Sequence, residues 1–277
     1  MKASSSATAA TTVPDESDYT DLAITLSPEE YATAFRLMTA SATHPQNIAQ
    51  VVEERLLPQL RSEPTLLDAG AGSGAVAEQL APFFSALTLL EPNPNQITGF
   101  HHDRAVVLHE SLQTFASTKQ FDLVVLSHVL YHVPPAEWLS FVERVMTFVR
   151  PGGYALIVMA AARGPEYELC RAFADTLTGD GAQLIATVRA ANYDHDVVAT
   201  MSGFKAATLS EMETICRFLV LETCYTAEQL GDLNVEQSQA LDGEIRSRAK
   251  SYRTADGKYQ LDQDEDIVII RKESVGP

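Results

Sequence analysis

Apolar runs and segments of helical period alternate along the chain from about residue 65 to residue 160. The apolar runs predict strands buried on both faces, because such strands are apolar throughout, and the segments between them predict helices. The predicted strands are 65–69, 86–91, 104–108, 121–127 and 153–160. Between them, helices are predicted at 74–82, 94–100 and 135–149 and a short turn of helix at 111–116. Strands that alternate with helices imply a parallel α/β sheet with right-handed crossovers.

Helices are expected on both sides of this region. Ser27-Pro28-Glu29-Glu30 supplies an N-cap, a proline at the first helical position and acids in the first turn, so a helix begins there. A second helix is predicted at about 45–60. After residue 160 the pattern predicts inserted helices at 164–192, a sixth strand at 195–201, a helix at 210–221, a charged helical stretch at 226–251, and closing segments at 258–261 and 266–271. The last segment is apolar and fits an antiparallel final strand.

A glycine-rich turn follows the first predicted strand and reads LDAGAGSG over residues 67–74. Gly70, Gly72 and Gly74 permit a sharp turn and let a ligand approach the backbone. The helix that starts near Ala75 would point its amino terminus at an anionic group of that ligand. The turn therefore predicts a nucleoside cofactor. It does not say which one, because it also satisfies the looser G-x-G-x-x-(G/A) pattern of nicotinamide-binding folds.

Two acidic residues bear on the choice of cofactor. Glu91 ends the second strand about twenty residues after the first glycine, where a carboxylate can accept both ribose hydroxyls in either cofactor class. Asp68 would place negative charge beside a pyrophosphate, whereas the same charge favours a zwitterionic or cationic ligand. The alternatives are that Asp68 only caps the turn and that Glu91 is an exposed charge before Pro92.

Two later segments complete a set of motifs. They read FDLVVLSH at 121–128 and RPGG at 150–153, where the proline and glycines end a helix and turn the chain into the fifth strand. With the acidic glycine turn and Glu91, these segments resemble the class I S-adenosylmethionine-dependent methyltransferases over roughly residues 66–160. The resemblance implies a Rossmann-like, doubly wound, mostly parallel seven-stranded sheet with an antiparallel last strand. It also implies that N-terminal helices at 23–62 and the insertion at 164–192 cap the pocket.

The same resemblance implies S-adenosylmethionine as the cofactor and S-adenosylhomocysteine as its product. The cofactor-binding residues that we expect from it are Asp68, Gly70, Gly72, Gly74, Glu91, Gln96, Ser111 and Ser127.

A closer resemblance, to small-molecule amine methyltransferases of the histamine N-methyltransferase type, rests on three short motifs. They are YATAFR at 31–36, EPNPNQ at 91–96 and LYHV at 130–133. The residues that this resemblance implies for acceptor binding are Tyr31, His44, His128, Tyr131, His132 and Asp262. His44 stands where that family has a glutamate for the cationic amine, and His128 stands where it has a glutamine. These departures argue against histamine itself as the acceptor.

Methyl transfer requires an acceptor lone pair in line with the activated S–CH3 bond and away from water. A hydroxyl or a protonated amine must also lose a proton, and neutral histidine can accept it. We therefore expect His128 and His132 to be catalytic. The alternatives are that His128 caps the cofactor loop and that His132 packs against a helix. No metal is expected, because these two histidines lie in a strand-to-loop segment without a third ligand close in sequence.

Composition limits the partners and the setting. The formal charge of −17 argues against a nucleic-acid partner, because a phosphate backbone needs a basic face. No apolar stretch approaches the roughly 18 residues of a membrane span, and the amino terminus lacks an apolar signal core, so we expect a cytoplasmic protein without a membrane partner. Cys170, Cys216 and Cys224 have no metal-ligand spacing and are expected to be free thiols. We predict a disordered tail at 1–22, one domain at 23–277, and a monomer or homodimer.

Together these features predict an enzyme that moves a methyl group from S-adenosylmethionine to a nitrogen or oxygen of a small molecule, with nitrogen slightly preferred. The first alternative is O-methylation of a phenol or carboxylate. A nicotinamide-dependent dehydrogenase shares the glycine turn, but the segments at 121–128 and 150–153 do not support it. A non-catalytic methyltransferase-like partner subunit is a further alternative, and the intact glycine turn and His128 argue against it.

Overall fold

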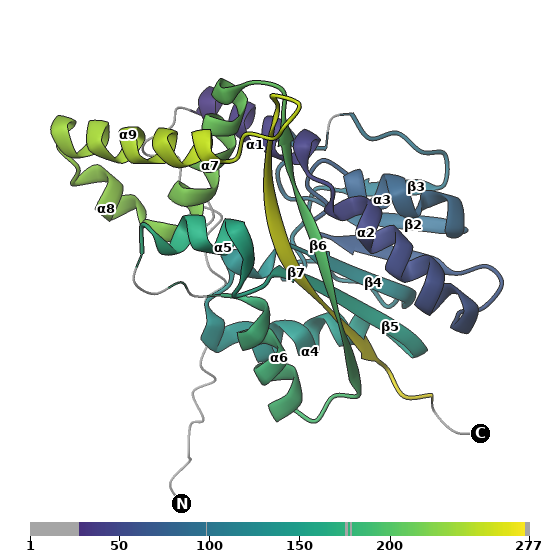
Figure 1. Ribbon diagram of the computed structural model, residues 1–277. Helices are drawn as coiled ribbons and strands as arrows, with labels where there is room; N and C mark the ends of the chain where they lie inside the picture. Colours follow the sequence, from purple (N-terminus) through teal and green to yellow (C-terminus); the bar gives the residue numbers. More distant parts are fainter. Residues whose placement is uncertain (1–27, 98, 175–176, 178, 275–277) are drawn as a thin grey trace, which may run out of the picture.

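The centre of the molecule is a seven-stranded sheet (Figure 1). The computed structural model describes residues 28–97, 99–174, 177 and 179–274. The strands are β1 (Thr65–Ala69), β2 (Ala86–Leu90), β3 (Ala105–Leu108), β4 (Phe121–Ser127), β5 (Val149–Ala160), β6 (His195–Ala206) and β7 (Tyr259–Arg271). Their order is β3-β2-β1-β4-β5-β7-β6. The pairings among β1 to β5 are parallel and β7 is antiparallel to both of its neighbours, so the predicted sheet is confirmed.

Helices cover both faces of the sheet (Figure 1). On one face, α2 (His44–Val51) and α3 (Ala75–Leu80) enclose an apolar core with β1 and β2. The opposite face is covered by α4 (Trp138–Phe148) and α6 (Gly181–Ala190), which enclose a second apolar core. Because both faces are buried, the central strands are apolar along their length, as the sequence pattern indicated. After α2 the chain continues through a π-helical turn (Val52–Leu56) and a 3-10 turn (Leu57–Gln59).

The strands β6 and β7 extend past the end of β5. The pairing of β5 with β7 stops at Ala160 and Glu265, whereas the pairing of β6 with β7 continues to Ala206 and Tyr259. A third apolar core surrounds this extension. The helices that contribute to this core or lie beside it in Figure 1 are α1 (Pro28–Ser41), α5 (Gly164–Arg171), α7 (Leu209–Cys224), α8 (Ala227–Gly231) and α9 (Val235–Ser251). We call these helices and the strand extension the cap region.

The predicted cap is built differently from the expectation. Within the segment 164–192, α5 belongs to the cap region, but α6 packs against α4 in the core below the sheet. The charged helical stretch expected at 226–251 forms α8 and α9, and Ile245 and Ala249 of α9 enter the third core. Most of the cap region therefore follows β6 in the chain. The predicted tail at 1–22 lies outside the described residues.

Two predicted elements differ in the structure. The helix expected at 94–100 is absent from the described part of that segment, which forms turns in which Asn93 accepts from the backbone N–H groups of Asn95 and Gln96. Pro92 and Pro94 favour this course, because proline restricts the residue before it and asparagine stabilises turns. The closing segments 258–261 and 266–271 form one strand, β7, since pairing with β6 keeps the polar residues between them extended. The short turn expected at 111–116 is present as a single hydrogen-bonded turn.

Within the described ranges, no helix combines the length and the apolar character that crossing a bilayer would require. The three cysteines, Cys170, Cys216 and Cys224, are free thiols, as expected.

Candidate functional site

The glycine turn connects the carboxyl end of β1 to the amino end of α3. Gly70, Gly72 and Gly74 adopt φ angles of 76°, 54° and 81°, a region that side chains with a Cβ rarely occupy. A Cβ on Gly70 would also clash with Val129, so the turn packs closely against the segment after β4. At Gly72 the nearest side-chain atoms to such a Cβ are Phe35 Cζ at 3.7 Å and Gln96 Oε1 at 4.0 Å. Gly72 therefore has space in front of it, as the approach of a ligand requires.

Glu91 holds the turn from the end of β2. Its carboxylate accepts hydrogen bonds from the backbone N–H groups of Gly72 and Asn93, both at 2.8 Å. Burial raises the pKa of Glu91, and these two hydrogen bonds only partly oppose the rise. The carboxylate thus bridges the glycine turn and the loop after β2, at the position where a ribose would bind in a nucleoside site.

Two buried polar atoms near this turn have no hydrogen-bond partner in the described structure. They are Asp68 Oδ2 at the end of β1 and Ser127 Oγ at the end of β4. Burial, together with the charge of Glu91, raises the pKa of Asp68 to about 7. An unsatisfied buried polar atom costs about 1–3 kcal/mol, so a ligand or a bound water is expected to satisfy each one. A zwitterionic amino-acid group fits this pair, because its ammonium group is a donor for both oxygens.

Gln96 and Ser111 occupy different settings at the edge of this site. Gln96 is half-buried in the loop after β2 and directs its amide oxygen toward Gly72. Ser111 places its hydroxyl 3.2 Å from the hydroxyl of Thr114 and accepts from the Thr114 backbone N–H at 3.3 Å. The structure therefore brings Gln96 to the glycine turn, whereas the Ser111 side chain caps its own turn.

The helix α1 covers the glycine turn from the cap region. Tyr31 packs its ring against Phe218 of α7, with centroids 5.4 Å apart, and donates its hydroxyl to Glu222 Oε1 at 3.1 Å. Phe35, one helical turn later, reaches Gly72. Burial raises the pKa of Glu222 to about 7. Sequence reasoning did not identify Glu222, because its partner Tyr31 lies 191 positions earlier in the chain.

A second group of polar side chains meets at the carboxyl ends of β4 and β5. His128 follows β4 and places Nε2 3.0 Å from Glu265 Oε1 and Nδ1 3.1 Å from the hydroxyl of Tyr131. The His44 ring, at the start of α2, lies edge-on to it with centroids 4.7 Å apart. Tyr131 also accepts from the backbone N–H of Ala160 at 2.6 Å. We call His44, His128 and Glu265 the histidine cluster.

The backbone and the charges of the histidine cluster are unusual. His128 has a φ angle of 57°, which is uncommon for a residue other than glycine and often marks a functional position. Burial lowers the pKa of His44 to about 3, and the neighbouring His128 adds to this effect, so His44 is neutral. Burial favours a higher pKa for Glu265, but the hydrogen bond and charge of His128 outweigh it and lower the pKa overall. Glu265 is therefore an ionised side chain with no exposed surface.

Two expected acceptor residues lie outside this cluster. His132 is exposed in the turn after β4, and its ring makes no hydrogen bond to the part of the chain that is described. Asp262 is on the face of β7 opposite to Glu265, because side chains alternate along a strand, and it accepts a hydrogen bond from Gln260 at 2.6 Å. Sequence reasoning missed Glu265, which lies in a run of acids. Strand alternation was the signal available, since Gln263 and Glu265 are buried in this run.

Comparison with known proteins identifies the family. A model of the methyltransferase domain family matches residues 42–211, which is more than half of the chain. The chain belongs to this methyltransferase family. Membership confirms the expected enzyme class and agrees with S-adenosylmethionine as the cofactor. It gives no support to the nicotinamide-dependent alternative, and it does not show that the chain is of the histamine N-methyltransferase type.

Individual relatives match over shorter stretches. A ubiquinone biosynthesis O-methyltransferase of Methylobacterium sp. is 38% identical over 96 residues, which cover 32% of this methyltransferase and 38% of the relative. Nodulation protein S of Rhizobium tropici is 32% identical over 103 residues, which cover 35% and 42%. The methyltransferase thus spans about two fifths of the length of these curated relatives.

Solved structures share the fold. A Bacillus halodurans protein assigned as a methyltransferase has a TM-score of 0.55 and 15% identity, with 83% of this chain and 100% of that chain covered. The YcgJ protein of Bacillus subtilis has a TM-score of 0.53 and 12% identity, with 84% and 100% covered. At these identities the likeness shows the Rossmann-like architecture alone.

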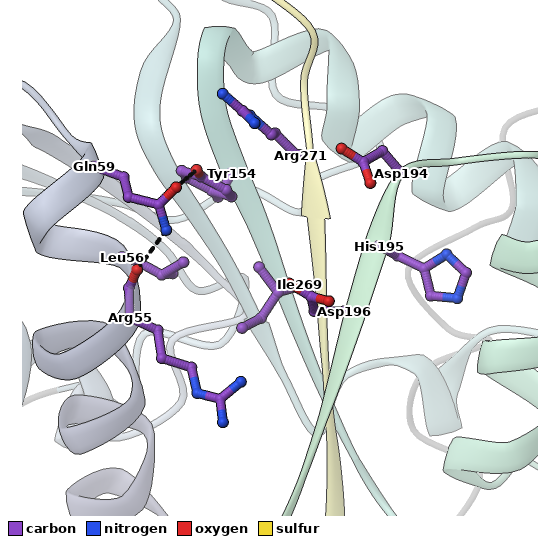
Figure 2. A pocket seen from close by; sticks show the side chains of 9 residues that line it. All are labelled: Arg55, Leu56, Gln59, Tyr154, Asp194, His195, Asp196, Ile269 and Arg271. Atoms are coloured by element: carbon purple, nitrogen blue, oxygen red, sulfur yellow. Dashed lines mark hydrogen bonds between the residues drawn. The ribbon is translucent and has the colours of Figure 1, made fainter.

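The amino ends of the strands in this methyltransferase carry other polar residues. Figure 2 shows the residues that line a hollow, which has a volume of about 260 Å³. In its lining, Tyr154 donates its hydroxyl to Gln59 Oε1 at 2.8 Å, and His195 and Arg271 also contribute. Tyr154, His195 and Arg271 lie in the first half of β5, at the start of β6 and at the end of β7, and Gln59 ends the 3-10 turn after α2. Ligands of open α/β sheets bind at the carboxyl ends of the strands, so this hollow is at the wrong edge for the cofactor.

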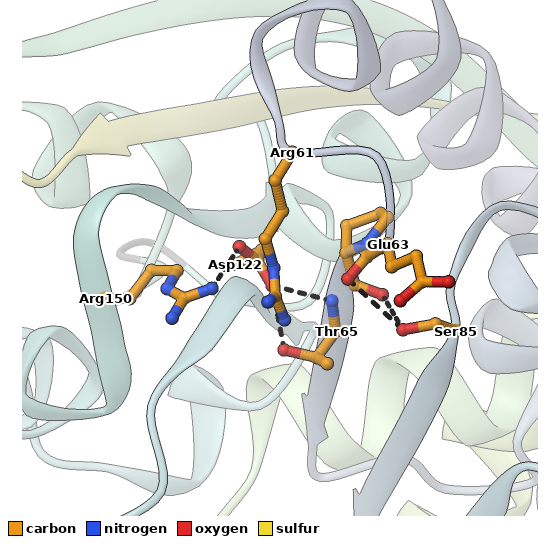
Figure 3. A network of polar contacts seen from close by, with 7 residues as sticks. Arg61, Glu63, Thr65, Ser85, Asp122 and Arg150 are labelled. Atoms are coloured by element: carbon orange, nitrogen blue, oxygen red, sulfur yellow. Dashed lines mark hydrogen bonds and ion pairs between the residues drawn. The ribbon is translucent and has the colours of Figure 1, made fainter.

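Asp122, at the start of β4, organises the same edge (Figure 3). It accepts hydrogen bonds from Arg61 at 3.0 Å, from Arg150 at 3.0 Å, and from both the backbone N–H and the hydroxyl of Thr65. Burial alone would raise the pKa of Asp122, but these hydrogen bonds outweigh it and lower the pKa. The aspartate of the FDLVVLSH segment and Arg150 of the RPGG segment thus tie β1, β4 and β5 together, which is a structural function.

Proposed function

We propose that the protein transfers a methyl group from S-adenosylmethionine to a nitrogen or oxygen of a small molecule. The observation that carries the proposal is the pair of unsatisfied buried atoms, Asp68 Oδ2 and Ser127 Oγ, beside the glycine turn and Glu91. These atoms lie at the carboxyl ends of β1 and β4, where strand order reverses and ligands of this fold bind. Family membership supplies the reaction class.

On the cofactor side, each protein group has a defined task. Glu91 would accept the ribose hydroxyls, while the glycine turn and the amino end of α3 favour the carboxylate of the methionine part. Asp68 would receive its ammonium group, directly or through the turn. Gln96 would contact the cofactor beside Gly72. The bound cofactor supplies an activated methyl group, so the protein mainly has to position the acceptor and keep water away.

On the acceptor side, we propose that the small molecule binds between the glycine turn and the histidine cluster. His128 would contact the acceptor and take its proton through Nδ1, the nitrogen that now faces Tyr131, while Glu265 holds Nε2–H. His44, Tyr31 and Tyr131 would line this space. His132 and Asp262 are weaker candidates, because the structure does not place them with the other residues.

Nitrogen is proposed ahead of oxygen because the motifs at 31–36, 91–96 and 130–133 resemble the histamine N-methyltransferase type. O-methylation of a phenol or carboxylate is the alternative, and it is supported by the name of the Methylobacterium relative. A cytoplasmic location, a monomeric or homodimeric state, and the division into a tail and one domain at 23–277 stay predictions.

Calorimetric titration tests the proposal. We expect micromolar binding of S-adenosylmethionine and S-adenosylhomocysteine, and no binding of NADH. The double variant Asp68→Ala/Glu91→Ala should lose this binding, whereas Glu110→Ala, which removes an exposed acid near the same edge, should keep it. Methylation of amines, phenols and carboxylates would then be screened. The proposal fails if the double variant binds as tightly as the parent, or if NADH binds in place of the sulfur nucleosides.

A further inference from the structure

We propose that His44, His128 and Glu265 form a binding site for a divalent transition-metal ion. One ligand atom from each of these residues lies within 4.8 Å of the other two. The residues come from the start of α2, the end of β4 and the middle of β7, so no local motif reveals them. The site itself is independent of the proposed function, and only its use in acceptor binding rests on that function.

The geometry is close to that of a metal centre. Zinc lies about 2.0–2.1 Å from histidine nitrogens and about 2.0–2.2 Å from carboxylate oxygens, so two ligands of one ion are at most about 4.2 Å apart. In tetrahedral geometry two such ligands lie about 3.4 Å apart, so a separation of up to 4.8 Å has to shrink by about 1.4 Å. Rotation of the His44 ring can supply this change, because His44 lies at the first position of α2 and no hydrogen bond to a described residue holds its nitrogens.

Each ligand is in a setting that suits coordination. The ring nitrogens of His44 make no hydrogen bond to a described residue, and Glu265 directs a carboxylate oxygen at His128 from a fully buried position. His128 directs Nε2 into the cluster and has Tyr131 as the partner of its other nitrogen. Histidine ligands of metals usually have such an outer partner, which fixes the orientation and tautomer of the ring. The ion would replace the proton that now lies between His128 Nε2 and Glu265.

The charge balance of the cluster favours a cation. Glu265 has no exposed surface, and among the described side chains its ion-pair partner is a histidine instead of a lysine or arginine. The guanidinium of Arg163 pairs with Asp264 and Asp266 on the opposite face of β7. Two neutral imidazoles and one carboxylate carry a net charge of −1, so the one buried carboxylate would balance half of the charge of a divalent ion and an anionic donor from the acceptor could balance the rest.

Such a site would bear on acceptor binding. Two histidines and one carboxylate leave coordination positions open, and an acceptor with an oxygen or nitrogen donor could occupy one of them. The ion would lower the pKa of a coordinated hydroxyl and position it at the end of β4. In that case His128 serves as a ligand, and the acceptor needs no histidine base.

Cobalt titration of the metal-stripped, tag-free protein tests the site. Hydrated Co²⁺ absorbs visible light only weakly, whereas four- or five-coordinate Co²⁺ bound by side chains absorbs much more strongly, so the gain in absorbance reports coordination by the protein. We expect one Co²⁺ per chain in the parent, displaced by Zn²⁺, and affinity at least about tenfold lower in both His44→Ala and Glu265→Gln. His195→Ala is the matched control, because His195 has carboxylates as its sequence neighbours, Asp194 and Asp196, but lies at the far end of the sheet and outside the histidine cluster. Its affinity should equal that of the parent.

The proposal is overturned if the parent binds no stoichiometric Co²⁺, if His44→Ala and Glu265→Gln bind it as the parent does, or if binding is lost in His195→Ala. S-adenosylhomocysteine binding, measured on the same samples, separates this result from the proposed function. A parent that binds S-adenosylhomocysteine but no Co²⁺ refutes the metal site alone. If Glu265→Gln does not fold, His44→Gln decides the question, because His44 is only partly buried and forms no hydrogen bond to a described residue.

Discussion

The cofactor side and the acceptor side of this methyltransferase are assembled in opposite ways. On the cofactor side, Asp68, the glycine turn, Glu91 and Gln96 lie within thirty residues of one another, and one strand-helix-strand unit positions them. On the acceptor side, the histidine cluster combines residues 44, 128 and 265, which meet only when α2, β4 and β7 are packed together. Local geometry therefore fixes one half of the site, and the complete fold fixes the other.

The largest expected effect concerns the burial of Asp68. The unfolded chain releases the Asp68 proton near the ordinary pKa of 3.8, whereas the folded protein retains it up to about pH 7, so ionisation costs stability as the pH rises through this interval. Asp68→Asn removes that cost, and we expect it to be more stable than the parent by about 4 kcal/mol at pH 7 but by less than about 1 kcal/mol at pH 4. Denaturant unfolding at both pH values measures this. Equal gains at both would show that ionisation is not the cause.

Loss of Glu91 should weaken cofactor binding without changing the acceptor side. Glu91→Ala removes two hydrogen bonds to a carboxylate, and we expect S-adenosylhomocysteine to bind about 100-fold more weakly, which corresponds to about 2.7 kcal/mol. Calorimetry provides the affinity. The acceptor side should be unaffected, so Co²⁺ binding serves as the control. Unchanged nucleoside affinity would mean that Glu91 only braces the turn.

A smaller effect is expected when the acceptor side alone is changed. Glu265→Gln keeps the shape of the side chain but removes the charge next to His128, and we expect about tenfold slower methyl transfer, or about 1.4 kcal/mol in the barrier. S-adenosylhomocysteine affinity should stay within twofold. The pH profile of turnover should also shift, because the lost charge lies next to His128. A residue that only supports the fold would instead lower turnover equally at every pH. Parallel loss of nucleoside binding would contradict the division into two sides.

The smallest effect is expected at Tyr131. Tyr131→Phe removes the hydroxyl that contacts His128 Nδ1 and accepts from Ala160 N–H, and we expect about fivefold slower turnover, close to 1 kcal/mol. Steady-state kinetics with a saturating cofactor measures it. A loss as large as that of Glu265→Gln would indicate that the hydroxyl contacts the acceptor directly.

The same contrast explains what the sequence could predict. The strands, their mostly parallel order and the cofactor turn were predictable, because apolar runs and glycine spacing are local signals. The prediction of a helix at 94–100 was wrong, since turns around Asn93 competed with helical periodicity. Glu265 and Glu222 were missed because their partners, His128 and Tyr31, lie 137 and 191 positions away. The continuity of β7 was missed for the same reason, as β6 rather than local propensity keeps its acidic stretch extended.

The position of β7 also sets the order in which the molecule can be completed during synthesis. β6 pairs with β7 and not with β5, so it has no neighbour in the sheet until α7, α8 and α9 have been made and the last strand emerges. Long-range pairing of this kind forms late and leaves a strand edge open for aggregation in the meantime. The glycine turn can form while the chain is still growing, whereas Glu265 is synthesised only with the final strand. A ribosome-bound chain that stops before β7 would carry the glycine turn without an acceptor site. Such a chain would depend on chaperones, because the edge of β6 would be unpaired.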